Sequence, residues 1–435
     1  MTIDLSSLTA SMPEGEFPIS SSVDDLLLAA LDRGGESLET GRYLLTFNEG
    51  QEEQGLSELR SFGISGADTR DFNQQTVELN GLGDTGFLYL SEVNVAIVSG
   101  TAFRDLGTSG LLSAQTERGA IASVEPEYFV FASSSDYLRG FARAAQVLAD
   151  DLAAPERGVE EQPEAEVLGT TWGVAATRAN LSAASGRGIK VAVLDTGFDL
   201  GHPDFVGRPV VSSSFVGQPV QDLNGHGTHC TGTACGPKAP AGSTPRYGIA
   251  HESLIHIGKV LSNSGSGTTA TVLAGMNWAI SQGCEVISMS LGAQIPVQSA
   301  YTNAGQAALD RGLLIVAAAG NAGAATFTGA PANSPTIMAV ASLDQNLAPS
   351  AYSCSGKIEI AGPGRDVFSS WPRPRMYNTI SGTSMATPHV AACAALWAQT
   401  SSSLRGIALW RKLQATARPL PYPASRVGAG LVQAP

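Results

Sequence analysis

Short apolar segments alternate with helical segments over residues 189–400, and this alternation constrains the fold more than any other feature of the sequence. Buried strands are predicted at 189–194, 254–261, 285–291, 313–319 and 336–342, and helices at 271–281, 300–311 and 384–399. Apolar strands that alternate with helices predict an α/β fold, a parallel sheet covered by helices on both faces. In such sheets sites form outside the carboxyl ends of the strands, so reactive side chains are expected there.

The charge of the chain divides into an acidic front and a mildly basic rear. Residues 1–168 contain 29 acidic and 9 basic residues, a formal charge of −20, and residues 169–435 carry +7 within a total of −13. This asymmetry predicts separate domains that attract each other. The acidic total argues against a nucleic-acid partner, which needs a basic surface. No apolar run approaches the ~20 residues of a membrane span, so no membrane partner is expected either.

The front of the chain predicts a second, smaller domain. Residues 42–132 read as strand (43–47), helix (51–62), strand (87–98), helix (101–112) and strand (120–131), an order that suits a small α+β domain of the split βαβ type. Residues 1–41 are expected to form an acidic flexible tail with one short helix at 23–31. Residues 133–168 are expected to form a linker with a helix at 136–150 and an exposed acidic stretch. The rear domain would then span residues 169–435.

Short motifs place an acid, a base and a nucleophile beside the predicted sheet. Asp195 ends the first core strand, His226 precedes a small-residue helix, and Ser384 opens the helix 384–399, with Pro388 expected in its first turn. A neutral imidazole can remove a proton from a serine hydroxyl, and a carboxylate on its other nitrogen fixes the tautomer. Asn321 follows the strand 313–319, where its amide could donate to an oxyanion.

These motifs resemble those of the subtilisin-like serine proteases, and of the proteinase K branch in particular. The matching segments are Val193-Leu194-Asp195-Thr196-Gly197, His226-Gly227-Thr228-His229-Cys230 and Ser381-Gly382-Thr383-Ser384-Met385-Ala386-Thr387-Pro388-His389-Val390. The likeness runs from about residue 171 to 434. It implies that Asp195 orients the histidine, His226 is the general base, Ser384 is the nucleophile and Asn321 is the oxyanion donor.

The same resemblance implies that substrate binds as an added strand between two segments of the chain. The matching positions are Ser264, Gly265, Ser266 and Gly267 on one side, and Ser290, Leu291 and Gly292 on the other. Main-chain pairing there would give affinity, and side-chain pockets would give preference. The pocket for the residue before the cut would be lined by Ala318, Ala319, Gly320 and residues 329–333. Because these residues are small and uncharged, we expect a roomy apolar pocket without selection for a charged side chain.

The front domain also resembles a known module, the inhibitor-type propeptide of subtilases. The likeness rests on the order of its elements and on Val124-Glu125-Pro126-Glu127. It implies an intramolecular chaperone and inhibitor that leaves its C-terminal tail in the cleft. The opposite charges of the two parts favour this docking, and salt would screen their attraction.

The resulting hypothesis is a serine endopeptidase that forms an acyl-enzyme and is made as a self-processing zymogen. A dedicated processing protease or a peptide ligase acting on one partner peptide stays open, as does a non-catalytic binding module. We expect protein or peptide substrates, the front domain as an intramolecular inhibitor, and a monomer. A cytoplasmic location is expected, because the five cysteines show no disulfide pattern and the N-terminus has no basic secretory region.

No cofactor is expected, and the metal-binding patterns are weak. Residues 236–246 contain no acid, where many family members have a calcium loop, and Asp204 occupies one family ligand position. That calcium site is expected to be absent, while other calcium sites stay open. Cys230 lies one helical turn after His226, so it is either a small buried apolar residue or a thiol that can disturb the base. His229 and His389 are expected to be structural.

Overall fold

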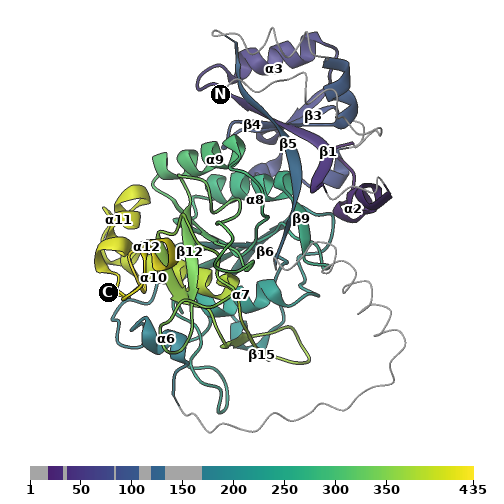
Figure 1. Cartoon of the computed structure of the whole chain (residues 1–435). Helices are drawn as coiled ribbons and strands as arrows, with labels where there is room; N and C mark the ends of the chain where they lie inside the picture. The colour runs from purple at the N-terminus through teal and green to yellow at the C-terminus, as the bar shows by residue number, and fades with distance from the viewer. Residues whose placement is uncertain (1–17, 33–36, 83–84, 107–118, 133–168) are drawn as a thin grey trace.

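The computed structural model describes residues 18–32, 37–82, 85–106, 119–132 and 169–435 (Figure 1). The helix predicted at 136–150 and the exposed linker after it lie outside these ranges. Across the described residues, no helix is both long and apolar enough to cross a bilayer.

Seven parallel strands form the central sheet of the rear domain, in the order β13-β12-β11-β10-β6-β8-β7. Each strand predicted from residue 189 onward is present, and β7 and β13 add to them. The predicted parallel sheet is therefore confirmed. The strands are β6 (Lys190–Asp195), β7 (Val210–Ser214), β8 (Leu254–Lys259), β10 (Val286–Met289), β11 (Leu314–Ala318), β12 (Met338–Leu343) and β13 (Ile360–Pro363).

Helices cover both faces of this sheet, which explains why its strands are apolar at successive positions. Val191 and Val193 of β6 pack in one core with the helices α7 (His226–Cys235) and α10 (Thr383–Thr400). Ala192 and Leu194 pack in a second core with α8 (Thr269–Ser281) and α9 (Ser299–Asp310). The remaining elements are α6 (Trp172–Ala176), α11 (Gly406–Thr416), α12 (Ala424–Val427), the short helix η4 (Pro203–Phe205) and the hairpin of β14 (Val367–Ser370) and β15 (Tyr377–Ile380).

The front domain is a sheet in the order β2-β3-β4-β1-β5, and β9 of the rear domain extends it by one strand. Its core lies between the sheet and α3 (Glu52–Ser61), which contributes Leu56 and Leu59, and includes a stacked pair of Tyr43 and Phe103 rings. The elements are β1 (Glu39–Phe47), β2 (Gly66–Asp68), η1 (Thr69–Asp71), η2 (Asn73–Gln75), η3 (Leu79–Gly81), β3 (Phe87–Leu90), β4 (Val95–Val98), β5 (Ile121–Phe131) and β9 (Ser266–Thr268). A helix at 100–106 is the described part of the one predicted at 101–112.

Three predictions about local structure need correction. The single strand predicted at 87–98 is a hairpin, because residues 91–94 form a turn that ends at Asn94 with φ 54°. Pro388 lies beyond the first turn of α10, which begins at Thr383.

The third correction concerns the predicted flexible tail. Its helix is present as α2 (Val23–Asp32), and β1 begins at Glu39. The apolar face of α2 is buried, so residues 18–32 are a packed part of the structure.

Candidate active site

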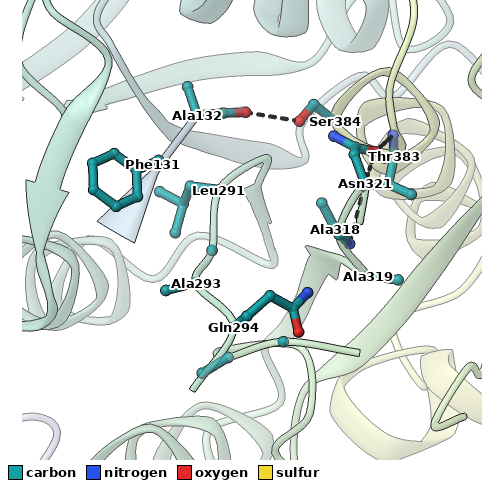
Figure 2. Close-up of a pocket in the computed structure, with 14 residues that line it drawn as sticks. Phe131, Ala132, Leu291, Ala293, Gln294, Ala318, Ala319, Asn321, Thr383 and Ser384 are labelled. Atoms are coloured by element: carbon teal, nitrogen blue, oxygen red, sulfur yellow. Dashed lines mark hydrogen bonds between the residues drawn. The ribbon is translucent and has the colours of Figure 1, made fainter. Parts of the chain in front are cut away.

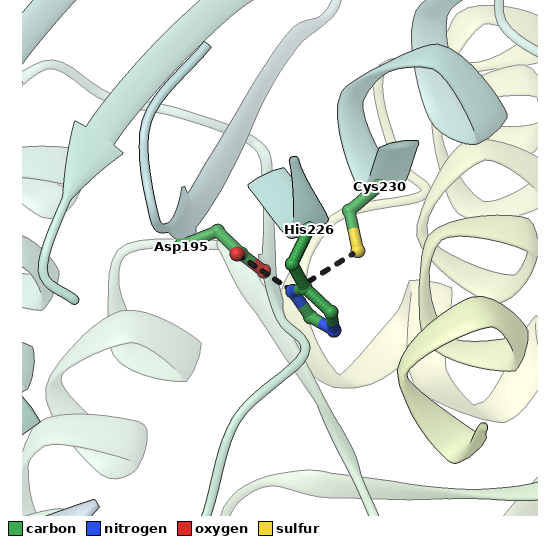
Figure 3. Close-up of side chains that lie close together, drawn as sticks. All are labelled: Asp195, His226 and Cys230. Carbon is green, nitrogen blue, oxygen red and sulfur yellow. Dashed lines mark hydrogen bonds and ion pairs between the residues drawn. The ribbon is translucent and has the colours of Figure 1, made fainter. Parts of the chain in front are cut away.

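Asp195 and His226 meet where a central strand ends and a helix begins. His226 Nδ1 lies 2.7 Å from Asp195 Oδ1, and both residues are buried (Figure 3). The close approach depends on glycine at position 227, because a Cβ there would lie 2.3 Å from the carbonyl oxygen of Gly197. The carboxylate therefore holds the ring through Nδ1, which leaves Nε2 as the nitrogen that can accept a proton.

A second buried carboxylate, Asp222, organises the turn that leads into His226. Its oxygens accept hydrogen bonds from the Thr196 hydroxyl (3.0 Å) and from the backbone N–H groups of Gly225 (2.9 Å) and Thr228 (2.9 Å). The first N–H groups of a helix lack partners within the helix, and a carboxylate satisfies them well. The sequence interpretation missed this residue. Gly225 and not Asp222 occupies the N-cap position of α7, so the usual N-cap signal does not mark this aspartate.

The charge on Asp195 determines how His226 titrates. Burial alone lowers the pKa of His226, but the adjacent Asp195 carboxylate outweighs it and raises that pKa well above its ordinary value of 6.5. Burial lowers the pKa of His229 to about 3, and its Nε2 lies 2.9 Å from the carbonyl oxygen of Val367. Burial likewise lowers the pKa of His389 to about 4. Burial therefore favours the neutral form of His229 and His389, whereas the adjacent Asp195 carboxylate favours the protonated form of His226.

Ser384 lies in the first turn of α10, and the proline that follows it shapes its surroundings. Pro388 has no N–H, so it cannot bond the carbonyl oxygen of Ser384 four residues earlier. That oxygen accepts instead from the hydroxyl of Ser290 (2.7 Å) and from the thiol of Cys230 (3.5 Å). The Cys230 sulfur also lies 3.9 Å from His226 Nδ1, so this buried thiol lies between the His226 ring and the backbone of Ser384.

The side chain of Asn321 is oriented by the start of the same helix. Its Oδ1 accepts hydrogen bonds from the N–H and the hydroxyl of Thr383, both at 2.9 Å. Because the carbonyl end of the amide caps the helix, the NH₂ end is the one that can donate to a substrate. Figure 2 shows Asn321 beside Ser384 on one wall of the pocket.

The two predicted substrate-binding segments enclose the end of β5. Phe131 exchanges two backbone hydrogen bonds with Gly292, each 3.0 Å, and pairs with Ser266 on the other side. Val130 pairs with Gly267, and the N–H of Ala132 donates to the carbonyl oxygen of Gly265 (2.9 Å). The hydroxyl of Ser384 lies 3.1 Å from the carbonyl oxygen of Ala132 and 3.2 Å from that of Ser290.

A pocket opens beneath Ala132 (Figure 2). Of the residues predicted for it, Ala318, Ala319, Gly320, Gly329 and Ala330 line it, and Leu291 of the predicted strand-pairing segment lines it as well. Pro331, Ala332 and Asn333 of the predicted stretch are not among its lining residues, and the Asn333 amide donates to the carbonyl oxygen of Ile295 (3.0 Å). Ser264, which was predicted for the pairing segment, has its hydroxyl 2.6 Å from that of Ser266. The polar side chain of Gln294, which the sequence interpretation did not name, also lines the pocket, so its lining is not apolar throughout.

Residues 186–430 match the sequence profile of the Subtilase family. The chain belongs to this family. It is 42% identical to "Thermitase" of Thermoactinomyces vulgaris over 227 residues, which cover 52% of this chain and 80% of thermitase. It is 39% identical to "Subtilisin Savinase" of Lederbergia lenta over 269 residues, or 60% and 96% of the two chains. It is 38% identical to "Alkaline protease" of Alkalihalobacillus alcalophilus over 284 residues, or 63% and 72%.

The predicted enzyme class is thereby confirmed: this subtilase is a serine endopeptidase that acts on proteins or peptides and needs no organic cofactor. The assignment to the proteinase K branch stays a prediction. So does the division of the chain at the exact domain boundaries given above.

The residues around Asp204 do not fit a calcium ion. The hydroxyls of Tyr247 and Tyr377 both donate to Asp204 Oδ2, at 2.5 and 3.0 Å. The guanidinium of Arg208 donates to the carbonyl oxygens of Cys235 and Ser253 nearby. Calcium needs six to eight oxygen ligands. The Oδ1 atom of Asp204 is buried without a hydrogen-bond partner among the described residues. It is a single oxygen, however, because the two phenols donate hydrogen bonds to Asp204 and residues 236–246 contain no acid, so six oxygen ligands are not available.

Proposed function

We propose that this subtilase is a zymogen that cuts its own chain after Ala132, with Asp195, His226 and Ser384 as the triad. One observation carries the proposal. The segment Phe129–Ala132 lies in the cleft as an added strand, and its last carbonyl group is within 3.1 Å of the Ser384 hydroxyl. A strand paired on both sides is held at fixed register, so it presents one particular peptide bond to the serine.

The chemistry follows from this placement. His226 Nε2 takes the hydroxyl proton while Ser384 Oγ bonds to the carbonyl carbon of Ala132, and Asn321 donates to the resulting oxyanion. His226 then gives the proton to the nitrogen of Ser133 as the peptide bond breaks. Water attacks the acyl-enzyme, again with His226 as base, and leaves a carboxylate on Ala132. No hydrogen bond joins Ser384 to His226 in the described structure, so the hydroxyl must first turn from the carbonyl oxygens towards the ring.

The same pairing supports the front domain as an inhibitor. After the cut, the strand that ends at Ala132 keeps its hydrogen bonds to Gly265 and Gly292 and still blocks substrate from the cleft. Activity then depends on release of the portion that ends at Ala132, residues 1–132. The described residues offer nothing that favours a peptide ligase.

Expression of the wild type beside Ser384→Ala tests this proposal. Mass spectrometry of the wild type should show a new N-terminus at Ser133, and Ser384→Ala should stay an uncut chain of 435 residues. Processing of purified Ser384→Ala would show that another protease makes the cut. A wild-type N-terminus elsewhere would overturn the assignment to Ala132. Labelling of Ser384 by a fluorophosphonate would exclude a non-catalytic binding module.

A further inference from the structure

The pocket beneath Ala132 ends in one polar side chain, that of Gln294. Small or apolar residues form most of its lining, among them Leu291, Ala318 and Gly320. Figure 2 places Gln294 at the end of the pocket opposite Ser384. Alanine at position 132 does not extend beyond its Cβ, so a longer side chain at this position of a substrate would approach the Gln294 amide.

The amide of Gln294 lies between two glycines of the facing walls. A Cβ on Gly320 would lie 3.0 Å from its Nε2, and a Cβ on Gly329 would lie 3.3 Å from it. The Nε2 group donates to the sulfur of Cys354 at 3.5 Å, which is a weak acceptor. The Oε1 atom accepts no hydrogen bond from any described residue. The amide is therefore held in place yet keeps hydrogen-bonding capacity.

We propose that Gln294 is a specificity-determining residue, which favours substrates with a neutral hydrogen-bonding side chain, such as glutamine, before the cut. This inference rests on the proposed function of Ser384. An apolar side chain of the same length would remove water from the Gln294 amide without replacing its hydrogen bonds. A neutral hydrogen bond that is partly exposed to water changes preference by about threefold to tenfold.

Two peptides that differ only in glutamine or methionine before the cut provide the test. The ratio of their kcat/KM values is measured for the processed wild type, Gln294→Leu and Gln306→Leu. Gln306 is an exposed residue of α9 whose amide bonds Asp310, so it is a matched control. The glutamine-to-methionine ratio should fall about threefold to tenfold in Gln294→Leu alone.

An unchanged glutamine-to-methionine ratio in Gln294→Leu would overturn the proposal for this residue. Cleavage of either peptide would in that case still support the proposed function. A wild type that cleaves neither peptide and takes no fluorophosphonate label would instead overturn the proposed function, and this proposal with it.

A second, independent observation concerns α2, which lies against the strand in the cleft. Its residues Val23, Leu26, Leu27 and Ala30 form a buried cluster with Phe129 of β5 and with Val216 of the rear domain. Phe129 is fully buried and lies three residues before Ala132. The helix thus contacts both the docked strand and the domain on which it docks.

Polar contacts fix the same segment at both domains. The carbonyl oxygen of Ile19, before α2, accepts from Arg42 Nη1 at 3.0 Å, and Arg42 in turn pairs with Glu127 of β5. Asp24 of α2 accepts from the hydroxyl of Ser264 in the rear domain at 3.5 Å. Because a cut after Ala132 leaves residues 18–132 in one piece, α2 would remain on the cut product.

We infer that α2 is a clamp that delays release of the cut front domain and so delays activity. This inference rests on the proposed cut after Ala132. It is tested in the full chain with Leu27→Asp, and with Leu28→Asp as control. Leu27 is 3% exposed and Leu28 is 56% exposed on the same helix.

The measured quantity is the delay between the appearance of the Ser133 N-terminus and the appearance of peptidase activity. A buried charge should detach α2, so Leu27→Asp should shorten the delay at least about tenfold, and Leu28→Asp should match the wild type. The milder Leu27→Ala should shorten it less if folding tolerates the change. Equal delays in all four proteins would overturn the clamp. Absence of the Ser133 terminus would overturn the proposed cut instead.

Discussion

The carboxylates beside His226 and the surface on which the front domain docks differ in where their hydrogen-bond partners come from. The carboxylates bond residues of the rear domain itself, whereas backbone N–H groups of the docking surface bond carboxylates of the front domain. Asp195 and Asp222 take their hydrogen bonds from residues 196–228. By contrast, the N–H of Ala270 donates to Glu127, and the N–H groups of Ser299 and Ala300 donate to Glu125. Loss of the front domain would therefore leave the bonds of Asp195 and Asp222 to their neighbours in place and open the docking surface to water or substrate.

The two glutamates of β5 differ in their surroundings, although each caps a helix. Glu127 is fully buried, accepts from Ala270 at the start of α8, and pairs with Arg42 at 2.6 Å. Glu125 is only partly buried and accepts from Ser299 and Ala300 at the start of α9. Burial alone raises the pKa of Glu127, but Arg42 and its hydrogen bonds outweigh this and hold that pKa below its ordinary value of 4.5.

The largest effect on docking is expected from Glu127→Gln. Removing one partner of a buried ion pair costs about 3–5 kcal/mol. Both partners of this pair belong to the front domain, so the variant destabilises the docked domain itself and also weakens its bond to the N–H of Ala270. The front domain should therefore leave faster after the cut, and activity should appear sooner. Glu125→Gln is the matched control, because its carboxylate makes the same kind of bond near solvent. Equal release rates of the two variants would show that the buried Glu127 contributes no more to docking than the partly buried Glu125.

The same pair gives a pH dependence with a defined sign. Because Arg42 and the hydrogen bonds to the carboxylate lower the pKa of Glu127 in the folded, docked state, the stability that it contributes is complete above pH 4.5. It is lost as the pH falls through the lower pKa of that state. Release from the cut wild type should accelerate below pH 4.5, and Glu127→Gln should lack this acceleration. Release rates of both proteins from pH 3 to 7 provide the measurement.

Asn321→Ala should affect the catalytic centre and leave docking unchanged. Loss of an oxyanion donor lowers turnover by ~10²–10³, as found for such donors in other enzymes. The effect should appear in kcat for a peptide substrate, while release of the front domain matches the wild type. A loss under tenfold would mean that Asn321 is not the donor.

Tyr247→Phe should reduce the stability of the rear domain by a smaller amount. It removes one of the two phenol donors to Asp204, and a buried acceptor that loses its donor costs about 1–3 kcal/mol. Because we assign no calcium to this cluster, the change in unfolding free energy should be equal with and without EDTA. Tyr422→Phe, at an exposed tyrosine, is the control. An effect seen only without EDTA would indicate a metal at Asp204.

The smallest effect is expected from salt. A cut after Ala132 would give a front part of −15 and a rear part of +2, so the charge difference is smaller than the division at residue 168 suggests. Within the described residues, Arg311 with Glu92 is the ion pair that joins the two domains, and it is partly exposed. An exposed pair contributes 0.2–1 kcal/mol, so the inhibition constant of the front domain should rise about twofold to fivefold between low and high salt. A constant that does not change would remove electrostatics from the docking.

Much of the rear domain could be predicted, because its signals are local. The strands were visible as apolar runs, and Asp195, His226 and Ser384 stand in short motifs next to element ends. The prediction failed where local patterns were ambiguous. The hairpin of β3 and β4 has β-type residues on both sides of a turn, and residues 18–32 look like an acidic tail until the apolar face of α2 is seen against Phe129.

Sequence alone determined the parallel sheet and the motifs that contain Asp195, His226 and Ser384, because periodicity and motifs are properties of neighbouring residues. Only the tertiary structure decided which peptide bond faces Ser384, that Asp222 supports His226, and that Gln294 ends the pocket. The physical reason is that these relations join segments far apart in the chain. The docked strand is held by backbone hydrogen bonds, which any residue other than proline can make and which therefore leave no mark in the sequence.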